Sequence, residues 1–252
     1  MSVALMYHGL FDENSDRHRI DAEDMPYGVS LDNFRAQLLH IATKTHGLLV
    51  PDQPTPDVVI TFDDGHISNY DHAMALLEPH GMQAVFFITT GFIGTRQHFC
   101  DWHHLREMAD AGMVIGAHGH THRFFEDLSA EDAEQEFRQS KDLLEQAIGR
   151  EVDSMSFPGG RYSNCNLKQA RDTGYRQIYG SVFGNIQQPN DTRSICRIPV
   201  RITTTEQQFL DIINENPATF LKARATSNAK KLLKKTIGNK LYHGLYKSLA
   251  GR

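Results

Sequence analysis

The sequence contains few cysteines, a single tryptophan and no long apolar run. Its three cysteines, Cys100, Cys165 and Cys196, are odd in number and widely spaced, which argues against a disulfide framework and favours a reducing compartment. No stretch approaches the roughly eighteen apolar residues of a membrane span. The segment from Met1 to His8 also lacks the basic start and apolar centre of a signal peptide. We therefore expect a cytoplasmic protein.

Acidic residues outnumber basic ones, but the two signs are unevenly distributed. The formal net charge is −5, whereas residues 216–252 contain nine Lys or Arg and no Asp or Glu. The rest of the chain therefore carries a net charge of −14. Because of this asymmetry, we divide the sequence into a main domain over residues 1–215 and a basic, helical extension over residues 216–252.

Strand-like and helix-like segments alternate along the main domain. Continuous apolar runs predict buried strands over residues 3–7, 58–62 and 84–88. Shorter strands are expected over 113–117, 154–157, 176–179 and 197–202, with helices beginning near 30, 69, 102, 129 and 166. With 252 residues, 40% of them hydrophobic, the chain is long enough for one full core. The alternation predicts a parallel α/β sheet or barrel.

The most informative stretch is the run Val58-Val59-Ile60-Thr61-Phe62-Asp63-Asp64-Gly65. It is typical of a buried strand that ends in two carboxylates, and α/β folds place their ligands at the carboxyl ends of such strands. Because neighbouring side chains of an extended chain face opposite ways, one aspartate can bind a metal while the other faces water or substrate. An ordinary Asp-Gly turn is the alternative interpretation.

Histidines follow another predicted strand. His118 and His122 are four residues apart, with His120 between them, in a glycine-containing loop after residues 113–117. Two imidazoles and one carboxylate would form a three-ligand site with open positions, as a hydrolytic metal requires. Such a metal lowers the pKa of bound water toward about 7, and a nearby carboxylate can take the proton. A chance pairing among the 14 histidines is the alternative, but agreement with the Asp-Asp-Gly motif argues against it.

These motifs resemble those of the NodB-homology polysaccharide deacetylases, carbohydrate esterase family four. The likeness rests on Thr61-Phe62-Asp63-Asp64-Gly65, His118-Gly119-His120-Thr121-His122 and Phe157-Pro158-Gly159-Gly160-Arg161-Tyr162. It extends over roughly residues 3–202. The resemblance implies an irregular (β/α) barrel with fewer than eight strands. It also implies removal of an acetyl group from a sugar, most often N-acetylglucosamine within a glycan.

Carried over residue by residue, the resemblance implies that Asp64, His118 and His122 bind a divalent metal, usually zinc. Asp63 would be the general base that activates the attacking water. The oxyanion would be held by the metal and by a backbone N–H in the turn around Gly159, where the absence of side chains lets a substrate approach closely.

The sequence departs from the family pattern in its third motif and beyond. Many members have an arginine before the proline of this motif, where Ser156 and Phe157 stand here, and Arg161 is the candidate replacement. The Asp-x-x-Asp-Trp stretch and the late Leu-x-x-His of the family, whose histidine is the general acid, have no counterpart.

The proton donor therefore has to be sought among other histidines. His8, at the end of the first predicted strand, is the catalytic candidate, and a supporting hydrogen bond is its alternative role. His66 and His120 stand beside the two motifs. For substrate binding we select Arg161, Trp102 and His120.

Residues 230–252 have a helical pattern of their own. Leu233, Ile237, Leu241, Leu245 and Leu249 recur every four residues, with lysines mostly off that stripe. One interpretation is a terminal helix that packs on the barrel. The other is peripheral contact with an anionic membrane at its inner face, which would suit a lipid-linked glycan. Nucleic-acid binding is not expected, because no recognition motif accompanies the lysines.

The sequence therefore predicts a zinc-dependent deacetylase that acts on an N-acetylated sugar in a cell-surface glycan or its precursor. Two other functions are left open. One is a weak or inactive glycan-binding barrel, which the missing Arg, Asp and His side chains suggest. The other is hydrolysis of a non-sugar amide C–N bond, because relatives of this family act on such bonds.

Overall fold

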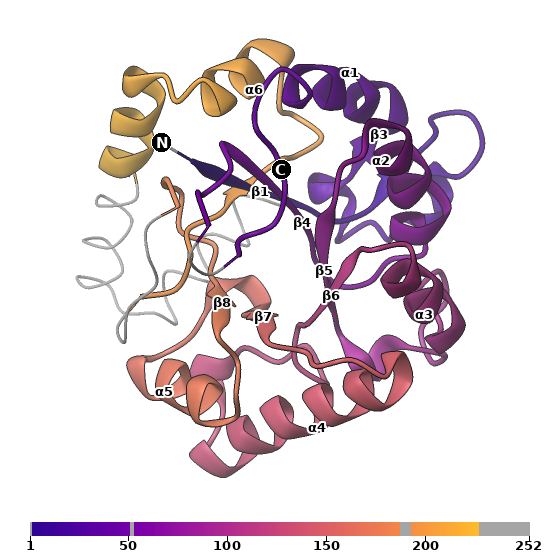
Figure 1. The fold of residues 1–252 in the computed structure, drawn as a ribbon, viewed down its shortest axis with the longest axis vertical. Helices are drawn as coiled ribbons and strands as arrows, with labels where there is room; N and C mark the ends of the chain where they lie inside the picture. The colour runs from indigo at the N-terminus through magenta and orange to yellow at the C-terminus, as the bar shows by residue number, and fades with distance from the viewer. Residues whose placement is uncertain (1, 51–52, 187–192, 227–252) are drawn as a thin grey trace.

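A computed structural model describes residues 2–50, 53–186 and 193–226. Within these residues, seven strands form one parallel sheet in the order β8-β7-β6-β5-β4-β1-β9. The sheet curls into an irregular barrel with fewer than eight strands, which confirms the predicted fold (Figure 1). The strands are β1 (Val3–Tyr7), β4 (Val58–Phe62), β5 (Ala84–Ile88), β6 (Val114–Ala117), β7 (Ser154–Ser156), β8 (Gln177–Tyr179) and β9 (Ile198–Pro199), with β2 (Leu10–Phe11) and β3 (Val29–Ser30) forming a separate pair.

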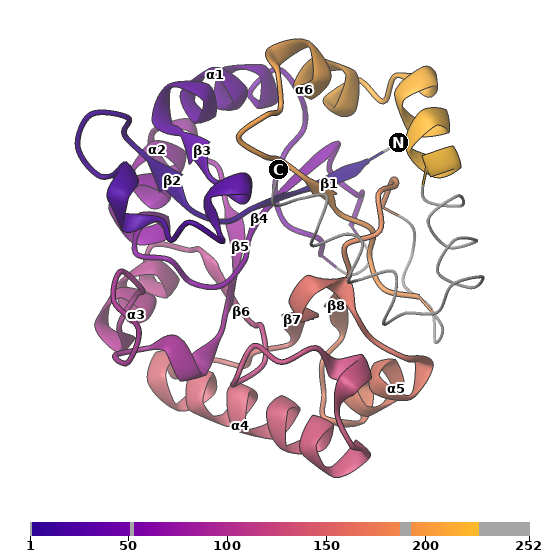
Figure 2. The same cartoon turned by 180° about the vertical axis from the view of Figure 1, so that it is seen from behind.

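The α-helices of the described residues surround the sheet. Seen from the front and from behind, they form a ring outside the strands (Figure 1, Figure 2). Ser30 begins α1 and Ser129 begins α4, and each serine accepts a hydrogen bond from the backbone N–H three residues on. The helices are α1 (Leu31–Ile41), α2 (Ala75–Leu77), α3 (Trp102–Asp110), α4 (Ala130–Ile148), α5 (Asn164–Asp172) and α6 (Glu206–Ile213).

The central strands are buried along their whole length. All residues of β1, β4 and β5 are buried, because helices cover the sheet, and this is why these strands are continuous apolar runs in the sequence. Tyr7 lies opposite Phe62 in the register of β1 and β4. The Phe62 ring stacks on Tyr7 at 5.3 Å and on Phe86 at 4.9 Å between centroids. This aromatic stack fixes the strand ends from which the site residues project.

A short segment around β9 joins the two ends of the curled sheet. Ile195 forms a parallel bridge with Tyr179 at the end of β8. Ile198 pairs with Leu5 in β1. Arg197, between these two contacts, is completely buried. The barrel is therefore completed by residues 195–199 and not by a long final strand.

Some elements differ from the sequence prediction. The strand predicted over 197–202 is confined to Ile198–Pro199, because Pro199 has no N–H to donate to a ladder. The helix predicted to begin near residue 69 is broken into a π-helical turn (Asn69–Met74), α2 and a 3₁₀ turn (Glu78–His80) that contains Pro79. Helix α6 was not predicted.

The described chain continues past α6 into helical residues 217–226. Phe220 of this stretch contacts Phe183 at 5.2 Å between ring centroids. Residues 230–252, for which the sequence predicts an amphipathic helix and membrane contact, lie outside the described residues. In the part that the structure describes, no helix is long and apolar enough to cross a membrane. The two-part division, the membrane contact and the cellular location stay predictions.

Candidate functional site

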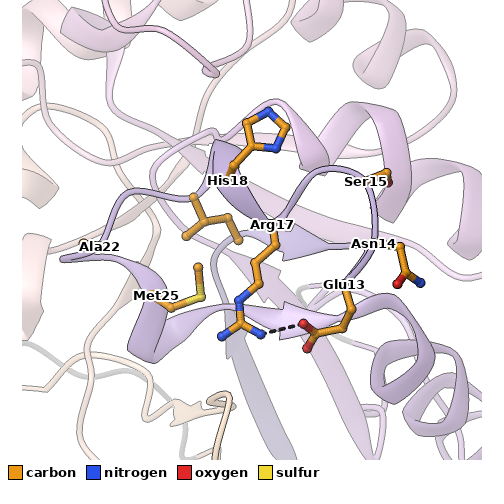
Figure 3. A pocket seen from close by; sticks show the side chains of 8 residues that line it. Glu13, Asn14, Ser15, Arg17, His18, Ala22 and Met25 are labelled. Atoms are coloured by element: carbon orange, nitrogen blue, oxygen red, sulfur yellow. Dashed lines mark hydrogen bonds and ion pairs between the residues drawn. The ribbon is translucent and has the colours of Figure 1, made fainter.

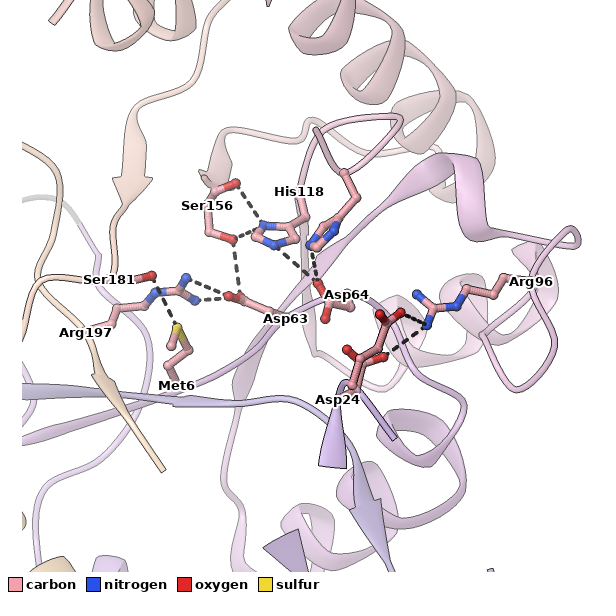
Figure 4. Close-up of polar contacts among 11 residues, drawn as sticks. Met6, Asp24, Asp63, Asp64, Arg96, His118, Ser156, Ser181 and Arg197 are labelled. Carbon is pink, nitrogen blue, oxygen red and sulfur yellow. Dashed lines mark hydrogen bonds and ion pairs between the residues drawn. The ribbon is translucent and has the colours of Figure 1, made fainter. Parts of the chain in front are cut away.

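Polar side chains gather where the parallel strands end. Asp63 and Asp64 directly follow β4, His118 follows β6, and Ser156 is the last residue of β7. Because parallel strands all end at one edge of a sheet, residues distant in the sequence meet there. Figure 4 shows these side chains converging with Arg197, whose guanidinium points at Asp63.

Asp64, His118 and His122 form a compact three-residue cluster. One potential ligand atom from each residue lies within 4.8 Å of the other two. Asp64 Oδ1 is 3.3 Å from His118 Nε2 and 3.1 Å from His122 Nε2. The His118 side chain is 2% exposed and that of His122 is 34% exposed, so the cluster opens to solvent on the His122 side.

Backbone and side-chain contacts orient the His118 ring. Its Nδ1 lies 2.9 Å from the carbonyl oxygen of Ser156 and 2.6 Å from the hydroxyl of the same residue. Because a carbonyl can only accept, Nδ1 carries the proton, and the Nε2 lone pair faces Asp64. This is the ring orientation that metal-ligating histidines require.

The donor set of this cluster fits a divalent cation. Asp64 Oδ1 is buried and has no hydrogen-bond partner among the described residues, although two ring nitrogens face it. An unsatisfied buried carboxylate oxygen is costly in a closed protein interior. Two imidazoles and one carboxylate form the three-ligand set of open catalytic zinc sites. The residues that the sequence selected for the metal are therefore brought together in a suitable chemical arrangement.

Arg197 neutralises the second aspartate, Asp63. Arg197 Nη1 donates to Asp63 Oδ1 at 2.6 Å, and Nη2 donates to Oδ2 at 2.7 Å. The Ser156 hydroxyl also donates to Oδ1, at 3.2 Å. Arg197 additionally donates to the carbonyl of Gly180 and the hydroxyl of Thr61, so its position is fixed from several elements.

The sequence prediction for this arginine was wrong. Arg161, the candidate replacement, forms ion pairs with Glu126 and Asp127 instead of Asp63. The guanidinium that pairs with Asp63 comes instead from Arg197, in the segment that completes the barrel. The single signal in the sequence was that Arg197 is the first residue of the strand predicted over 197–202.

Burial and neighbouring charges have opposite effects on the pKa values of Asp63 and Asp64. Burial raises the pKa of Asp63, but Arg197 and His118 outweigh it and hold this pKa below its ordinary value of 3.8. Burial also raises the pKa of Asp64, but His122, His8 and His118 together bring it far below 3.8. Both carboxyl groups are therefore ionised at neutral pH.

The two histidines of the cluster respond differently. Burial lowers the pKa of His118 to about 4, so this ring is neutral at physiological pH. Burial also acts against the charged form of His122, but the Asp64 charge outweighs it and raises the His122 pKa above 6.5. A cation that enters the cluster would therefore compete with a proton on His122.

Left-handed backbone geometry recurs at the site. The φ angle is 75° at Asp64 and 62° at His122, values that residues other than glycine seldom adopt. Gly159, the predicted oxyanion residue, has φ 60°, and a Cβ atom there would lie 2.8 Å from the Phe124 ring. Such geometry persists only where surrounding contacts enforce it, and it clusters at functional sites.

His8 stands at the end of β1, next to Asp63 in the register of the sheet. The Asp63 N–H donates to the carbonyl of Tyr7, and the His8 ring packs on Tyr27 at 4.7 Å between centroids. Its Nδ1 is buried and has no hydrogen-bond partner in the part of the chain that the structure describes. His8 is also close enough to lower the pKa values of Asp63 and Asp64.

The other histidine candidates are held by their own partners. Both ring nitrogens of His120 are engaged, Nδ1 by the Thr90 hydroxyl at 2.9 Å and Nε2 by Gln139 at 3.1 Å. His66 Nδ1 contacts Ser68 at 2.8 Å and its Nε2 contacts a carbonyl at 3.1 Å. Neither ring has a nitrogen left for the cluster in this arrangement.

The remaining predicted substrate residues occupy different surroundings. The Arg161 guanidinium lies over the Phe124 ring at 4.3 Å, and this ring adjoins Gly159, so Arg161 is at the edge of the site. Trp102 begins α3 and packs, partly buried, against the main hydrophobic core. No contact of Trp102 with the cluster is seen among the described residues.

A broad cavity lies on the loop between β2 and β3. It has a volume of about 620 Å³ and is lined by residues of the 13–25 segment, among them Arg17, His18 and Met25 (Figure 3). None of the cluster residues lines it. The cavity is therefore separate from the site at the strand ends.

The fold and the cluster together define a NodB-type barrel with a candidate metal centre. A family model described as Polysaccharide deacetylase matches residues 51–178, just over half of the sequence. The chain belongs to the polysaccharide deacetylase family.

One curated relative was also found. YxkH of Bacillus subtilis (strain 168), a polysaccharide deacetylase by name, is 31% identical over an alignment of 183 residues, and the match covers 68% of this chain and 61% of that protein. The chain therefore spans about 61% of the length of this relative.

Solved structures share the fold. The Streptococcus pyogenes deacetylase PplD in complex with acetate matches with a TM-score of 0.72 at 23% identity, over 84% of this chain and 97% of that one. A de-N-acetylase from Aggregatibacter actinomycetemcomitans matches with a TM-score of 0.70 at 17% identity, over 84% and 99%. At these identities the likeness establishes the barrel fold alone.

The family match covers most of the candidate site but not all of it. Residues 51–178 include Asp63, the three cluster residues and Gly159. They do not include His8 or Arg197. His8, the candidate proton donor, therefore lies before the matched segment, and Arg197, the partner of Asp63, lies after it.

Proposed function

We propose that the protein is a zinc-dependent deacetylase that hydrolyses the N-acetyl group of a sugar in a cell-surface glycan or its precursor. The observation that carries this proposal is the convergence of Asp64, His118 and His122 beside a buried, ionised Asp63. Family membership supports the deacetylase chemistry, and the open three-ligand set supports the metal.

Asp64 and the two histidine Nε2 atoms would hold the cation. When bound, a zinc ion supplies a more acidic water and polarises the acetyl carbonyl. His118 is suited to this role because Ser156 fixes its tautomer, and His122 because it is the exposed edge of the cluster.

Asp63 would take a proton from the attacking water. Its Oδ1 already accepts from Arg197 and Ser156, while Oδ2 accepts from Arg197 alone, which leaves Oδ2 the freer acceptor. Arg197 keeps the carboxylate ionised and fixes its direction, so no reorganisation is needed when the water attacks. The Gly159 N–H would stabilise the negative charge that develops on the carbonyl oxygen.

His8 would give a proton to the leaving nitrogen. The water oxygen bonds to the acetyl carbon, the C–N bond breaks, and the products are acetate and a free amine on the sugar. His8 follows β1 beside Asp63 in the register of the sheet, and its buried Nδ1 has no hydrogen-bond partner among the described residues. Arg161 and Phe124, at the edge beside Gly159, are proposed to contact the sugar, while Trp102 and His120 stay predictions for this role.

Acetate release from N-acetylglucosamine oligomers tests the proposal. We expect activity that a chelator removes and zinc restores, and losses of about 10²- to 10⁴-fold for Asp63→Asn and His8→Gln. His40→Gln is the matched control, because His40 is on α1 and pairs with Glu206. Activity that survives chelation or Asp63→Asn would contradict the assignment.

The rival functions predict other results. A glycan-binding barrel would bind oligomers without releasing acetate, although Arg197 removes one of the three reasons for expecting inactivity. A hydrolase of non-sugar amides would act faster on an N-acetylated amine that lacks a sugar.

A further inference from the structure

Glu136 is a buried carboxylate that the proposed reaction does not use. It lies on α4 and is 7% exposed. No Lys, Arg or His side chain of the described residues is within ion-pair distance of it. Burial of a lone carboxylate is unfavourable unless hydrogen bonds satisfy it, so the partners of Glu136 indicate why the helix carries it.

All three side-chain hydrogen bonds of Glu136 come from the loop between His118 and His122. Oε2 accepts from the backbone N–H of His120 at 2.6 Å and of Thr121 at 2.9 Å. Oε1 accepts from the Thr121 hydroxyl at 2.5 Å. The carboxylate therefore holds the middle of this loop from the side of α4.

The opposite side of the loop is held by the turn after β5. The Thr90 N–H donates to the carbonyl of Gly119 at 3.2 Å, and the Gly91 N–H donates to the carbonyl of His120 at 2.8 Å. Four backbone groups between the two histidines are thus satisfied from two sides, the amides of His120 and Thr121 by Glu136 and the carbonyls of Gly119 and His120 by residues 90 and 91.

The loop needs this support because its backbone is strained. His122 has φ 62°, in the left-handed region, whereas Gly119, at φ 74°, adopts a similar angle without strain because it is a glycine. Only glycine adopts such angles readily, and His122 must do so while its ring faces Asp64. Without Glu136, the two loop amides and the Thr121 hydroxyl would lose their acceptor, and His122 would be freer to leave its left-handed conformation.

We infer that Glu136 is a positioning residue for the metal ligands: it fixes the loop so that His118 and His122 meet Asp64 before the cation arrives. The inference rests on the proposed metal site and deepens it. Glu136 itself touches neither the ligand atoms nor the substrate in this arrangement. Removal of a residue that hydrogen-bonds a metal ligand commonly lowers metal affinity by about 10- to 100-fold. Because Glu136 acts through the backbone of the loop, we expect an effect at the lower end of this range.

Zinc affinity of the full chain, measured by competition with a chromophoric chelator, tests the inference. We expect Glu136→Ala to bind zinc about 10-fold more weakly. Glu136→Gln keeps a carbonyl acceptor for the two amides and should rescue most of this loss. Glu134→Ala is the matched control, because Glu134 is on the same helix, is exposed and pairs only with Arg138 among the described residues.

Cobalt(II) gives a readout that general destabilisation would not change. The visible absorption of bound cobalt reports ligand geometry, so it should shift in Glu136→Ala and stay unchanged in Glu136→Gln and Glu134→Ala. Wild-type zinc affinity together with a wild-type cobalt spectrum in Glu136→Ala would overturn the inference, even if the variant were less stable.

Two further outcomes are distinguishable. Should Glu136→Ala fail to fold, Thr121→Val removes one of the three donors and decides the matter: weaker zinc binding supports the inference, and unchanged binding overturns it. Absence of acetate release from the wild-type protein would defeat the proposed function while leaving the zinc and cobalt comparison valid.

Discussion

Arg197 and Asp63 form a buried two-pronged ion pair although they are 134 positions apart in the sequence. Neither side chain is more than 4% exposed. Paired N–H groups of a guanidinium match both oxygens of a carboxylate, which fixes distance and direction together. The pair therefore orients the proposed base and links the first half of the barrel to the segment that completes it.

Removal of this guanidinium should damage both stability and activity. Arg197→Met leaves a buried, unpaired carboxylate, so we expect a loss of about 3 to 5 kcal/mol in the free energy of unfolding. Acetate release should fall by about 10²-fold or more. Denaturant unfolding and the acetate assay measure the two effects. Arg176→Met is the control, because Arg176 is exposed and pairs with Glu151 and Asp153 at the surface.

The double variant Arg197→Met with Asp63→Asn refines this prediction. Because it removes the buried charge as well as its partner, it should be more stable than Arg197→Met alone. Equal stability of the two variants would contradict the view that the unpaired carboxylate causes the loss.

Removal of the Ser156 hydroxyl should lower activity through Asp63, the proposed base, and leave the zinc content unchanged. It contacts Asp63 Oδ1 at 3.2 Å and His118 Nδ1 at 2.6 Å. In Ser156→Ala the backbone carbonyl still holds His118, so zinc should be retained while activity falls about 10-fold, the effect of one hydrogen bond to a charged group. Metal analysis and steady-state kinetics measure this. Ser154→Ala is the control, because the Ser154 hydroxyl is buried in the same strand and has no hydrogen-bond partner among the described residues. Loss of zinc from Ser156→Ala would contradict the prediction.

A methyl group at Gly159 should be harmful for two separable reasons. The left-handed backbone costs about 1 to 2 kcal/mol for a non-glycine residue, and the new Cβ would approach the Phe124 ring to 2.8 Å. Gly149→Ala isolates the first cost, because Gly149 has φ 66° and nothing within 4 Å of its Cβ position. We expect Gly159→Ala to be less stable than Gly149→Ala by thermal unfolding. Adding Phe124→Ala should remove only the excess, and an unchanged excess would show that the clash is not its cause.

Asp16 should give a stabilisation that depends on pH. This carboxylate is 8% exposed and ties the loop after β2 to His72 in the π-helical turn. Burial raises its pKa, but the bonds from His72 and from the Asp12 N–H outweigh burial and lower it below 3.8. A carboxyl group with a lowered folded-state pKa stabilises the protein above its unfolded-state pKa, and this contribution is lost as the pH falls through the folded-state value.

The difference in unfolding free energy between wild type and Asp16→Asn should therefore be constant from about pH 6 to 8 and shrink below about pH 4. Denaturant titrations at several pH values measure it. Asp172→Asn, at the exposed end of α5, is the control and should show little change. A difference that grows on acidification would contradict the assigned sign.

The strands and the cluster were accessible from the sequence because local pattern determines them. β1, β4 and β5 are unbroken apolar runs, and their bounds match the prediction. The Asp-Asp pair and the His-x-x-x-His motif each directly follow a predicted strand. Because parallel strands end at the same edge of a sheet, the sequence alone predicted that these residues lie together.

Arg197 and Glu136 were not accessible, because their roles depend on tertiary contact. Nothing within a few residues of Arg197 marks it as the partner of Asp63, and the short β9 gives only a weak strand signal. Glu136 is one acid among several on a charged helix, and its burial follows from the loop that packs against it. Helix breaks at Pro79 and the two-residue β9 likewise reflect competition between local propensity and the surrounding barrel.

The route by which the barrel is completed has a consequence for biosynthesis. A nascent chain that has left the ribosome only through β8 already contains Asp64, His118 and His122, yet Asp63 still lacks its counter-charge. Arrival of residues 195–199 both joins β8 to β1 and delivers the guanidinium of Arg197. A chain that ended before residue 195 would therefore carry every proposed metal ligand, while the proposed base would lack the guanidinium that pairs with it.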